Sequence, residues 1–302
     1  DILKTIPVEE IQLDVDNLIK IISSWKKALE EQQKYTAKLK FLDKTEKNIS
    51  LIFNDINEFD SKSYRKKLKV PHREEPLSLE IWLPEINLEK DLIIFMPGLG
   101  GDIDNFSWLG SGLSKKGWPV IFIEHKGSDS LAINSSIKGS EALPGSADIY
   151  LYRIKDLDST INAYKQDQLG FKSSNSYILM GHSLGSLISL LYEGNSPSNE
   201  FLSRCENAFI DFALTNVSKL LQCQLLEIPI PEFGKSKELK AIVGFNSFGS
   251  LIWSNQENTG IDVPILFIGG TFDLITPLVS EQFKLFLANE SNELNRFLII
   301  EG

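Results

Sequence analysis

Residues 177–186 read Tyr-Ile-Leu-Met-Gly-His-Ser-Leu-Gly-Ser, and they join a short apolar run to a Gly-x-Ser-x-Gly pattern. The run before Gly181 predicts a buried strand, and the apolar residues after Gly185 recur at helical spacing. A serine between two such elements stands on a sharp strand-to-helix turn, where small flanking residues let the strand and the helix approach each other. The pattern therefore predicts that Ser183 is a nucleophile. A serine that only forms a turn is the structural alternative.

Strands and helices alternate in the part of the chain that surrounds this stretch. Near-continuous apolar runs predict strands at residues 92–96, 120–124, 177–180, 241–245, 265–268 and 297–300. Apolar residues at helical spacing predict helices at residues 106–113, 151–164, 184–191 and 278–288. This alternation indicates an α/β protein with a mostly parallel central sheet and helices on both faces. Shorter runs predict an antiparallel edge at residues 51–56, 63–70 and 77–83.

Two segments depart from the alternation. Near the start of the chain, apolar residues recur at helical spacing, at Val15, Leu18, Ile19, Ile22, Trp25 and Leu29. They predict an N-terminal helical arm, residues 1–48, that docks on the main domain; a partner-binding or dimerising helix is the alternative. Residues 195–238 interrupt the main domain, residues 49–302, with helical spacing at Phe209, Phe212, Ala213, Val217, Leu220 and Leu221. We interpret this insertion as a helical cap.

The bulk composition excludes several classes of function. The chain has 302 residues, 42% of them hydrophobic, and a formal net charge of -10. It has no long basic run, so we expect no nucleic-acid partner, because phosphate binding needs clustered Lys and Arg. No apolar run approaches the roughly 20 residues of a membrane span, so we expect none. The cellular compartment stays open.

The two cysteines, Cys205 and Cys223, lie within the predicted cap. Neither has a second Cys or His at metal-ligand spacing, so we expect no metal site. A disulfide that joins two helices and a pair of reduced thiols are equally compatible with the sequence.

A glycine-rich turn follows the predicted strand at residues 92–96 and reads Pro-Gly-Leu-Gly-Gly at residues 97–101. Its glycines Gly98 and Gly100 let a backbone N–H point at the negative oxygen that develops when a serine attacks an acyl group. The N–H of Leu184 is the second predicted donor. A simple strand exit or a phosphate loop is the alternative, although the turn lacks the Lys-Ser/Thr of a P-loop.

The acid of a catalytic set is best assigned to Asp273, which follows a predicted buried strand and precedes Pro277. Its alternative role is to cap the next helix. Asn246 stands at the end of the preceding strand, so no carboxylate is available there.

The base is harder to place, because none of the three histidines follows Asp273. His182 belongs to the turn itself, and such a side chain is normally aimed away from the serine. His125 is a weak candidate base and otherwise a loop or pocket residue, and His72 lies in a polar turn. We expect the catalytic histidine within a few residues beyond Gly302.

Four motifs resemble those of the α/β-hydrolase superfamily, at residues 97–101, 125–130, 181–186 and 269–277. The resemblance covers roughly residues 50–302 and is greatest to the predicted dienelactone hydrolase and platelet-activating-factor acetylhydrolase-like branch. The cap with its two cysteines looks like that of cyanobacterial members. The chain departs from the family at Pro97, where a histidine is often found.

The resemblance implies ester hydrolysis by a Ser/Asp/His triad without a metal or an organic cofactor. It implies Ser183 as nucleophile, Asp273 as acid, and the N–H groups of Leu99 and Leu184 as oxyanion donors. We therefore expect a carboxylesterase or lipase-like enzyme whose substrate is a small-molecule or lipid-like ester. A non-catalytic protein of this fold that binds a lipid or a partner is one alternative. A thioesterase or acyltransferase is another.

Overall fold

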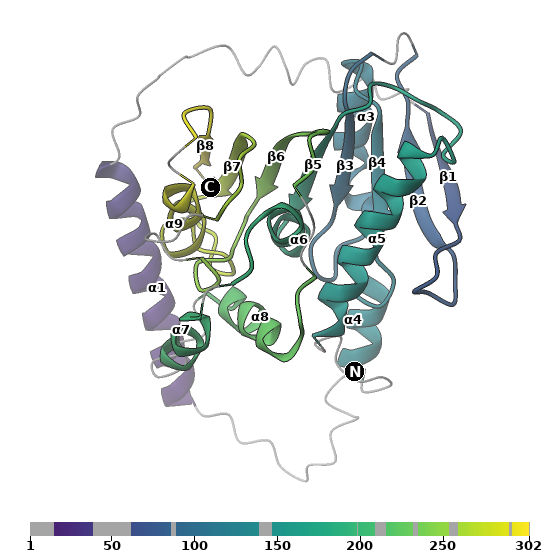
Figure 1. Ribbon diagram of the computed structural model, residues 1–302. Coiled ribbons are helices and arrows are strands. Elements are labelled where there is room, and N and C mark those ends of the chain that lie inside the picture. Colours follow the sequence, from purple (N-terminus) through teal and green to yellow (C-terminus); the bar gives the residue numbers. More distant parts are fainter. Residues whose placement is uncertain are drawn as a thin grey trace.

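The computed structural model describes residues 15–38, 62–85, 89–138, 147–197, 199–208, 216–231, 235–253, 259–289 and 292–301. These residues build one eight-stranded sheet with the order β1-β2-β4-β3-β5-β6-β7-β8 (Figure 1). The strands are β1 Ser63–Leu68, β2 Leu77–Trp82, β3 Leu92–Met96, β4 Val120–Glu124, β5 Tyr177–His182, β6 Leu239–Phe245, β7 Ile265–Gly270 and β8 Arg296–Ile300.

The sheet has one antiparallel edge. Strand β2 pairs antiparallel with both β1 and β4, whereas the pairs from β4 to β8 are all parallel. Parallel neighbours need crossover connections, which helices supply here. The predicted mostly parallel sheet and its antiparallel edge are therefore confirmed.

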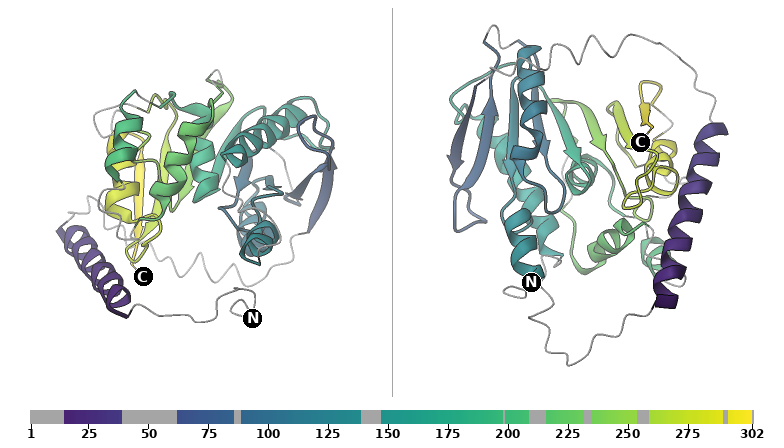
Figure 2. Two further views of the ribbon diagram at one scale, coloured as in Figure 1. Left: turned by 90° about the horizontal axis from the view of Figure 1, so that it is seen from below. Right: turned by 180° about the vertical axis from the view of Figure 1, so that it is seen from behind.

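Side chains of the central strands alternate between two apolar layers, as the two-residue period of a strand requires. In β3, Leu92 and Ile94 pack into one layer, and Ile93 and Phe95 pack into the other. The first layer contains the apolar residues of α5 and α6, and the second packs against α3. The two views of Figure 2 show these helices on opposite faces of the sheet. Burial on both faces explains why these strands read as unbroken apolar runs.

The remaining described elements connect the strands. The helices are α1 Val15–Lys38, α3 Ser107–Lys115, α4 Ser130–Ile137, α5 Asp148–Lys165, α6 Leu184–Glu193, α7 Phe201–Ala208, α8 Ser218–Gln224 and α9 Phe283–Ala288. Short 3-10 turns are η3 Ile103–Phe106 and η4 Leu225–Glu227, and η5 Leu278–Gln282 is a π-helix. With β5 entering α6 through the Gly-x-Ser-x-Gly turn, the strand order makes this an α/β-hydrolase fold.

Several sequence predictions fall partly outside the described residues. They are the strand at residues 51–56, the end of the N-terminal arm, and the cap positions Phe209, Phe212 and Ala213. Within the described part, the arm is α1, which contacts η5 and lies at the side of the sheet where η5 and α9 pack. Helix α4 was not predicted, because Ser130–Ile137 lacks a clear apolar stripe.

Candidate active site

The backbone of Ser183 is held in a strained conformation between β5 and α6. Its φ is 51° and its ψ is -117°, a region that residues with a Cβ rarely adopt. Two glycines make this turn possible. A Cβ on Gly181 would lie 2.3 Å from the carbonyl carbon of Gly185, and one on Gly185 would lie 2.0 Å from the oxygen of Met96. Both distances are far below any ordinary contact, so strand and helix meet only because neither residue has a side chain.

Hydrogen bonds fix Ser183 at the carboxyl edge of the sheet. Its N–H donates to the oxygen of Phe245 at 2.8 Å, which ties it to the end of β6. The backbone carbonyl oxygen of Ser183 accepts the N–H of Leu187 at 3.1 Å, which is the first helical hydrogen bond of α6. The strain is thus maintained by the packing of two neighbouring strands and one helix.

The glycine-rich turn after β3 lies directly against Ser183. A Cβ placed on Gly98 would be 3.1 Å from the Cβ of Ser183 and 2.9 Å from Nδ1 of His182. Gly100 has φ +71°, and its N–H donates to the oxygen of Ser128 at 2.8 Å. The predicted turn and the predicted nucleophile are therefore brought together.

Asp273 lies in the loop after β7 and makes four hydrogen bonds, two through each oxygen. Its Oδ1 accepts the N–H groups of Ile275 and Thr276 at 2.9 and 2.8 Å. Its Oδ2 accepts Nδ2 of Asn246 at 2.6 Å and the Thr276 hydroxyl at 2.5 Å. The carboxylate thus orders its own loop, as the capping alternative requires. It also contacts Asn246, the residue that follows β6.

His182 precedes Ser183 and lies against the glycine-rich turn. Its ring packs at 5.6 Å from the ring of Phe106 and beside Gly98. Burial lowers the pKa of His182, and the negative charge of Asp273 opposes that change. The carboxylate therefore lies within electrostatic range of the turn that carries Ser183.

The other two histidines meet at a different carboxylate. Nδ1 of His125 and Nε2 of His72 each lie 2.8 Å from Asp156 on α5, and Arg73 donates to both oxygens of Asp156 at 2.6 Å. Burial, helped by the charge of Arg153, lowers the pKa of His125 to about 4. Burial alone would raise the pKa of Asp156, but the hydrogen bonds from His125 and Arg73 outweigh it and hold the value at about 2.

Sequence reasoning missed two buried charged residues near the site. Arg153 on α5 donates to the oxygens of Pro97 and Gly98, at 2.6 and 3.0 Å. Glu281 in η5 accepts hydrogen bonds from Gln222 of α8 and from Gly249 and Ser250 after β6. A signal for Arg153 exists, because it stands at a position of α5 where the helical period of the apolar residues predicts an apolar side chain.

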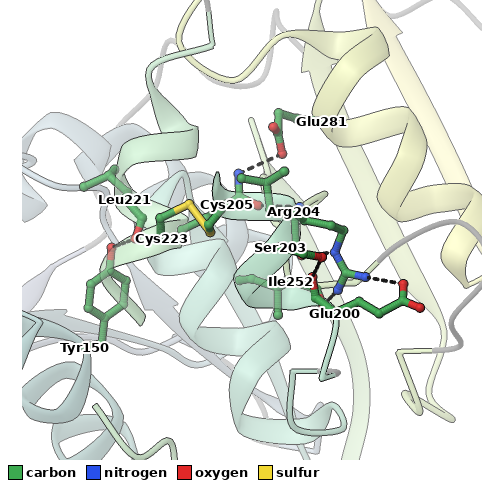
Figure 3. Close-up of a disulfide and its surroundings, with 11 residues drawn as sticks. Tyr150, Glu200, Ser203, Arg204, Cys205, Leu221, Cys223, Ile252 and Glu281 are labelled. Carbon is green, nitrogen blue, oxygen red and sulfur yellow. Dashed lines mark hydrogen bonds and ion pairs between the residues drawn. A yellow bond between two sulfur atoms is a disulfide. The ribbon is translucent and has the colours of Figure 1, made fainter. Parts of the chain in front are cut away.

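Helices α7 and α8, which lie in the segment predicted to be a cap, are joined by a disulfide between Cys205 and Cys223, with the Cα atoms 5.7 Å apart (Figure 3). This resolves the alternative that the sequence left open. The hydroxyl of Tyr150 donates to the oxygen of Leu221 at 2.5 Å, which attaches α8 to the start of α5. The N–H of Asn216 donates to the oxygen of Leu274 in the loop of Asp273 at 2.9 Å.

Two cavities lie away from Ser183. One, of about 460 Å³, is lined by polar residues that include Tyr177 and Glu238. It lies at the amino-terminal ends of β5 and β6, whereas Ser183 follows the carboxyl end of β5. The other, of about 310 Å³, is lined mainly by apolar residues of α7 and η4, among them Phe201, Leu202 and Leu226. The described ranges contain no group of three or more His, Cys, Asp or Glu side chains that could hold a metal ion. None of the helices described is both long and apolar enough to cross a membrane.

Comparison with known proteins gives structural similarity alone, because no protein-family model and no curated protein matches the chain. A dienelactone hydrolase from Anabaena variabilis is 14% identical over 80% of this chain and 86% of its own, with a TM-score of 0.49. An esterase from Thermogutta terrifontis is 14% identical over 81% and 83%, with a TM-score of 0.49. An acylaminoacyl peptidase from Pyrococcus horikoshii is 14% identical over 83% of this chain but 38% of its own, with a TM-score of 0.47. At this level of similarity the α/β-hydrolase fold rests on the strand order and on the turn at Ser183.

Proposed function

We propose that this protein is a serine hydrolase that cleaves carboxylic esters through an acyl-enzyme on Ser183. The backbone of this residue carries the proposal. A non-glycine residue at φ 51° and ψ -117° costs about 1–3 kcal/mol and persists only where surrounding packing enforces it. Strain of this kind gathers at functional sites, and here it presents a hydroxyl at the edge of a rigid parallel sheet.

The N–H groups of Leu99 and Leu184 are the proposed oxyanion donors. Leu184 is the first residue of α6, and N–H groups of a first helical turn lack intrahelical acceptors. Leu99 follows Gly98, whose backbone lies against Ser183. Two such donors in a preorganised turn stabilise the charge that appears when Ser183 Oγ attacks the ester carbonyl.

In the proposed mechanism a histidine takes the proton of Ser183 as the Oγ–carbon bond forms, then passes it to the leaving alkoxide. Water then attacks the acyl-enzyme with the same proton transfers, and the carboxylic acid leaves Ser183. Asp273 would orient that histidine. We retain the proposal that the histidine follows β8, because the N–H of Thr271 donates to the oxygen of Ile300 at 3.0 Å and joins the end of β8 to the loop of Asp273. A histidine that reaches Asp273 Oδ2 would share it with Asn246 or displace that amide.

The cap is proposed to select the acyl group. Apolar residues of its described helices, among them Leu220 and Leu221 of α8, favour an apolar acyl chain over a small polar one. The disulfide between α7 and α8 would keep the two helices in a fixed arrangement. Core packing of the same residues is the competing explanation.

The test is hydrolysis of nitrophenyl esters of increasing acyl length by the full native polypeptide, by residues 1–302, and by Ser183→Ala of each. Ser189→Ala is the matched control, because within the described part of the chain its hydroxyl bonds to Gly185 of its own helix. We expect Ser183→Ala to lose activity and Ser189→Ala to keep it. A native polypeptide that is active while residues 1–302 are nearly inactive would support a base beyond Gly302. No hydrolysis of any ester would favour a binding protein of this fold.

A further inference from the structure

Arg153 is buried in an unusual way for a charged residue. It is 1% exposed, and its hydrogen bonds to other described residues all go to neutral groups. These are the backbone oxygens of Pro97 and Gly98 at 2.6 and 3.0 Å, and the hydroxyl and backbone oxygen of Ser128 at 2.8 and 3.3 Å. Withdrawing a guanidinium from water is unfavourable, and an apolar residue would pack α5 at least as well. The position therefore calls for an explanation other than helix packing.

The carboxylate on the next turn of α5 does not neutralise Arg153 directly. Asp156 accepts hydrogen bonds from Arg73, His72 and His125 instead. Burial lowers the pKa of Arg153 to about 9, with the charge of Asp156 opposing the change, so the guanidinium is protonated at neutral pH. A positive charge thus lies behind the glycine-rich turn.

The geometry of the turn shows what this charge does. The peptide between Gly98 and Leu99 is trans, as are all peptide bonds of the described residues, so its C=O and N–H point in opposite directions. The C=O of Gly98 points at Arg153. The N–H of Leu99 therefore points away from Arg153, and no described residue accepts it. Gly98 itself lies against Ser183.

We propose that Arg153 is the positioning residue of the oxyanion turn: its guanidinium holds the Pro97 and Gly98 carbonyls so that the Leu99 N–H faces the reacting carbonyl of the substrate. A hydrogen bond to the C=O of a peptide also polarises the N–H of the same peptide and makes it a better donor. The positive charge of Arg153 strengthens this polarisation, because the guanidinium is buried behind the turn and solvent does not screen it. The inference rests on the proposed ester hydrolysis and names a residue that this reaction needs besides its triad.

The control is Arg296 at the start of β8. It also donates to two backbone oxygens, those of Glu293 and Asn295, both at 2.8 Å, but these lie outside the turn and outside the proposed cap. Arg153→Met, Arg153→Lys and Arg296→Met are therefore compared with the wild type in the full native polypeptide. The readouts are kcat, KM, the thermal midpoint, and the inhibition constant of a trifluoromethyl ketone, on which the serine forms a tetrahedral oxyanion.

Loss of one oxyanion donor lowers kcat by about 10²–10³-fold. We expect Arg153→Met to approach that loss in kcat, to weaken the ketone by a similar factor, and to leave KM within roughly threefold. Arg153→Lys should have a kcat and a ketone affinity between those of the wild type and Arg153→Met, because lysine keeps the charge but not the paired donors. Arg296→Met should leave kcat, ketone binding and the thermal midpoint unchanged, because Arg296 is exposed.

A folded Arg153→Met with kcat and ketone affinity within threefold of the wild type would overturn the inference. If that variant does not fold, Arg153→Lys decides by the same criterion. A wild type that neither hydrolyses esters nor binds the ketone refutes the proposed function itself, and the role of Arg153 falls with it.

Discussion

Glu281 joins several elements of the fold, so we expect its replacement to destabilise the protein strongly. It is fully buried in η5 and accepts five hydrogen bonds. Its Oε1 accepts Nδ2 of Asn216 at 2.6 Å and the Ser250 hydroxyl at 2.9 Å, and its Oε2 accepts Nε2 of Gln222 at 3.1 Å. The N–H groups of Gly249 and Ser250 complete the set at 3.1 and 3.0 Å. One carboxylate thus joins α8, the loop after β6 and the element that follows the loop of Asp273.

The expected loss in the free energy of unfolding follows from the buried hydrogen-bond donors that each replacement leaves without an acceptor. Glu281→Ala removes every acceptor, and each buried donor without a partner costs about 1–3 kcal/mol. With Asn216 and Gln222 both buried, and two backbone N–H groups beside them, we expect a loss of roughly 4–6 kcal/mol. This is a large part of the 5–15 kcal/mol that is typical of a whole domain. Glu281→Gln keeps the volume and one oxygen, so we expect roughly 2 kcal/mol.

The assay is urea unfolding, followed by fluorescence, at fixed pH and with the disulfide intact. Glu200→Gln is the control, because Glu200 is exposed and its contact with Arg204 is a surface pair of little weight. The control should unfold as the wild type does. If Glu281→Ala unfolds within 1 kcal/mol of the wild type, the hydrogen-bond reasoning is refuted.

Three further outcomes are expected. Replacement of Cys205 and Cys223 by Ser should lower the free energy of unfolding by about 3 kcal/mol, the value for a loop of this size, and equal stability of the two forms would contradict it. Ser183→Gly should be about 1 kcal/mol more stable than Ser183→Ala, because glycine relieves the positive φ; a less stable glycine variant would argue against strain. His125 has a folded pKa below its unfolded value, so its full contribution to the free energy of unfolding is present above pH 6.5. As the pH falls from 6.5 to about 4, we expect roughly 3 kcal/mol of this free energy to be lost. His125→Gln should lack that part of the acid-induced loss, and parallel curves for the two proteins would exclude it.

The sheet and the turn at Ser183 could be predicted because their signals are local. The apolar runs are continuous where strands are buried on both faces, and Gly181 and Gly185 mark the place where strand and helix come too close for a Cβ. The same locality explains the correct antiparallel edge. Helix α4 was missed because its stability comes from capping by Asp129, which accepts the N–H of Ala132, and not from an apolar stripe.

The supporting groups of the site could not be predicted, because their partners lie far away in the sequence. Gln32 of α1 donates to the oxygen of Thr271, 239 residues along the chain, and so docks the N-terminal helix on the loop of Asp273. Arg153 meets the turn at Gly98 from 55 residues away. A polar residue in an apolar stripe signals a buried contact but does not name the partner. The disulfide was open for the same reason, since spacing alone does not give the distance between two cysteines.

The most direct test of the central claim is covalent labelling of the full native polypeptide with a fluorophosphonate, followed by peptide mapping with mass spectrometry. The reagent phosphorus bonds to an activated serine oxygen and fluoride leaves, so the adduct records which hydroxyl is nucleophilic. We predict one adduct, on the peptide that contains Ser183, and none in Ser183→Ala. A native polypeptide that stays unlabelled, or that is labelled at another serine, would contradict the assignment of Ser183 as a catalytic nucleophile.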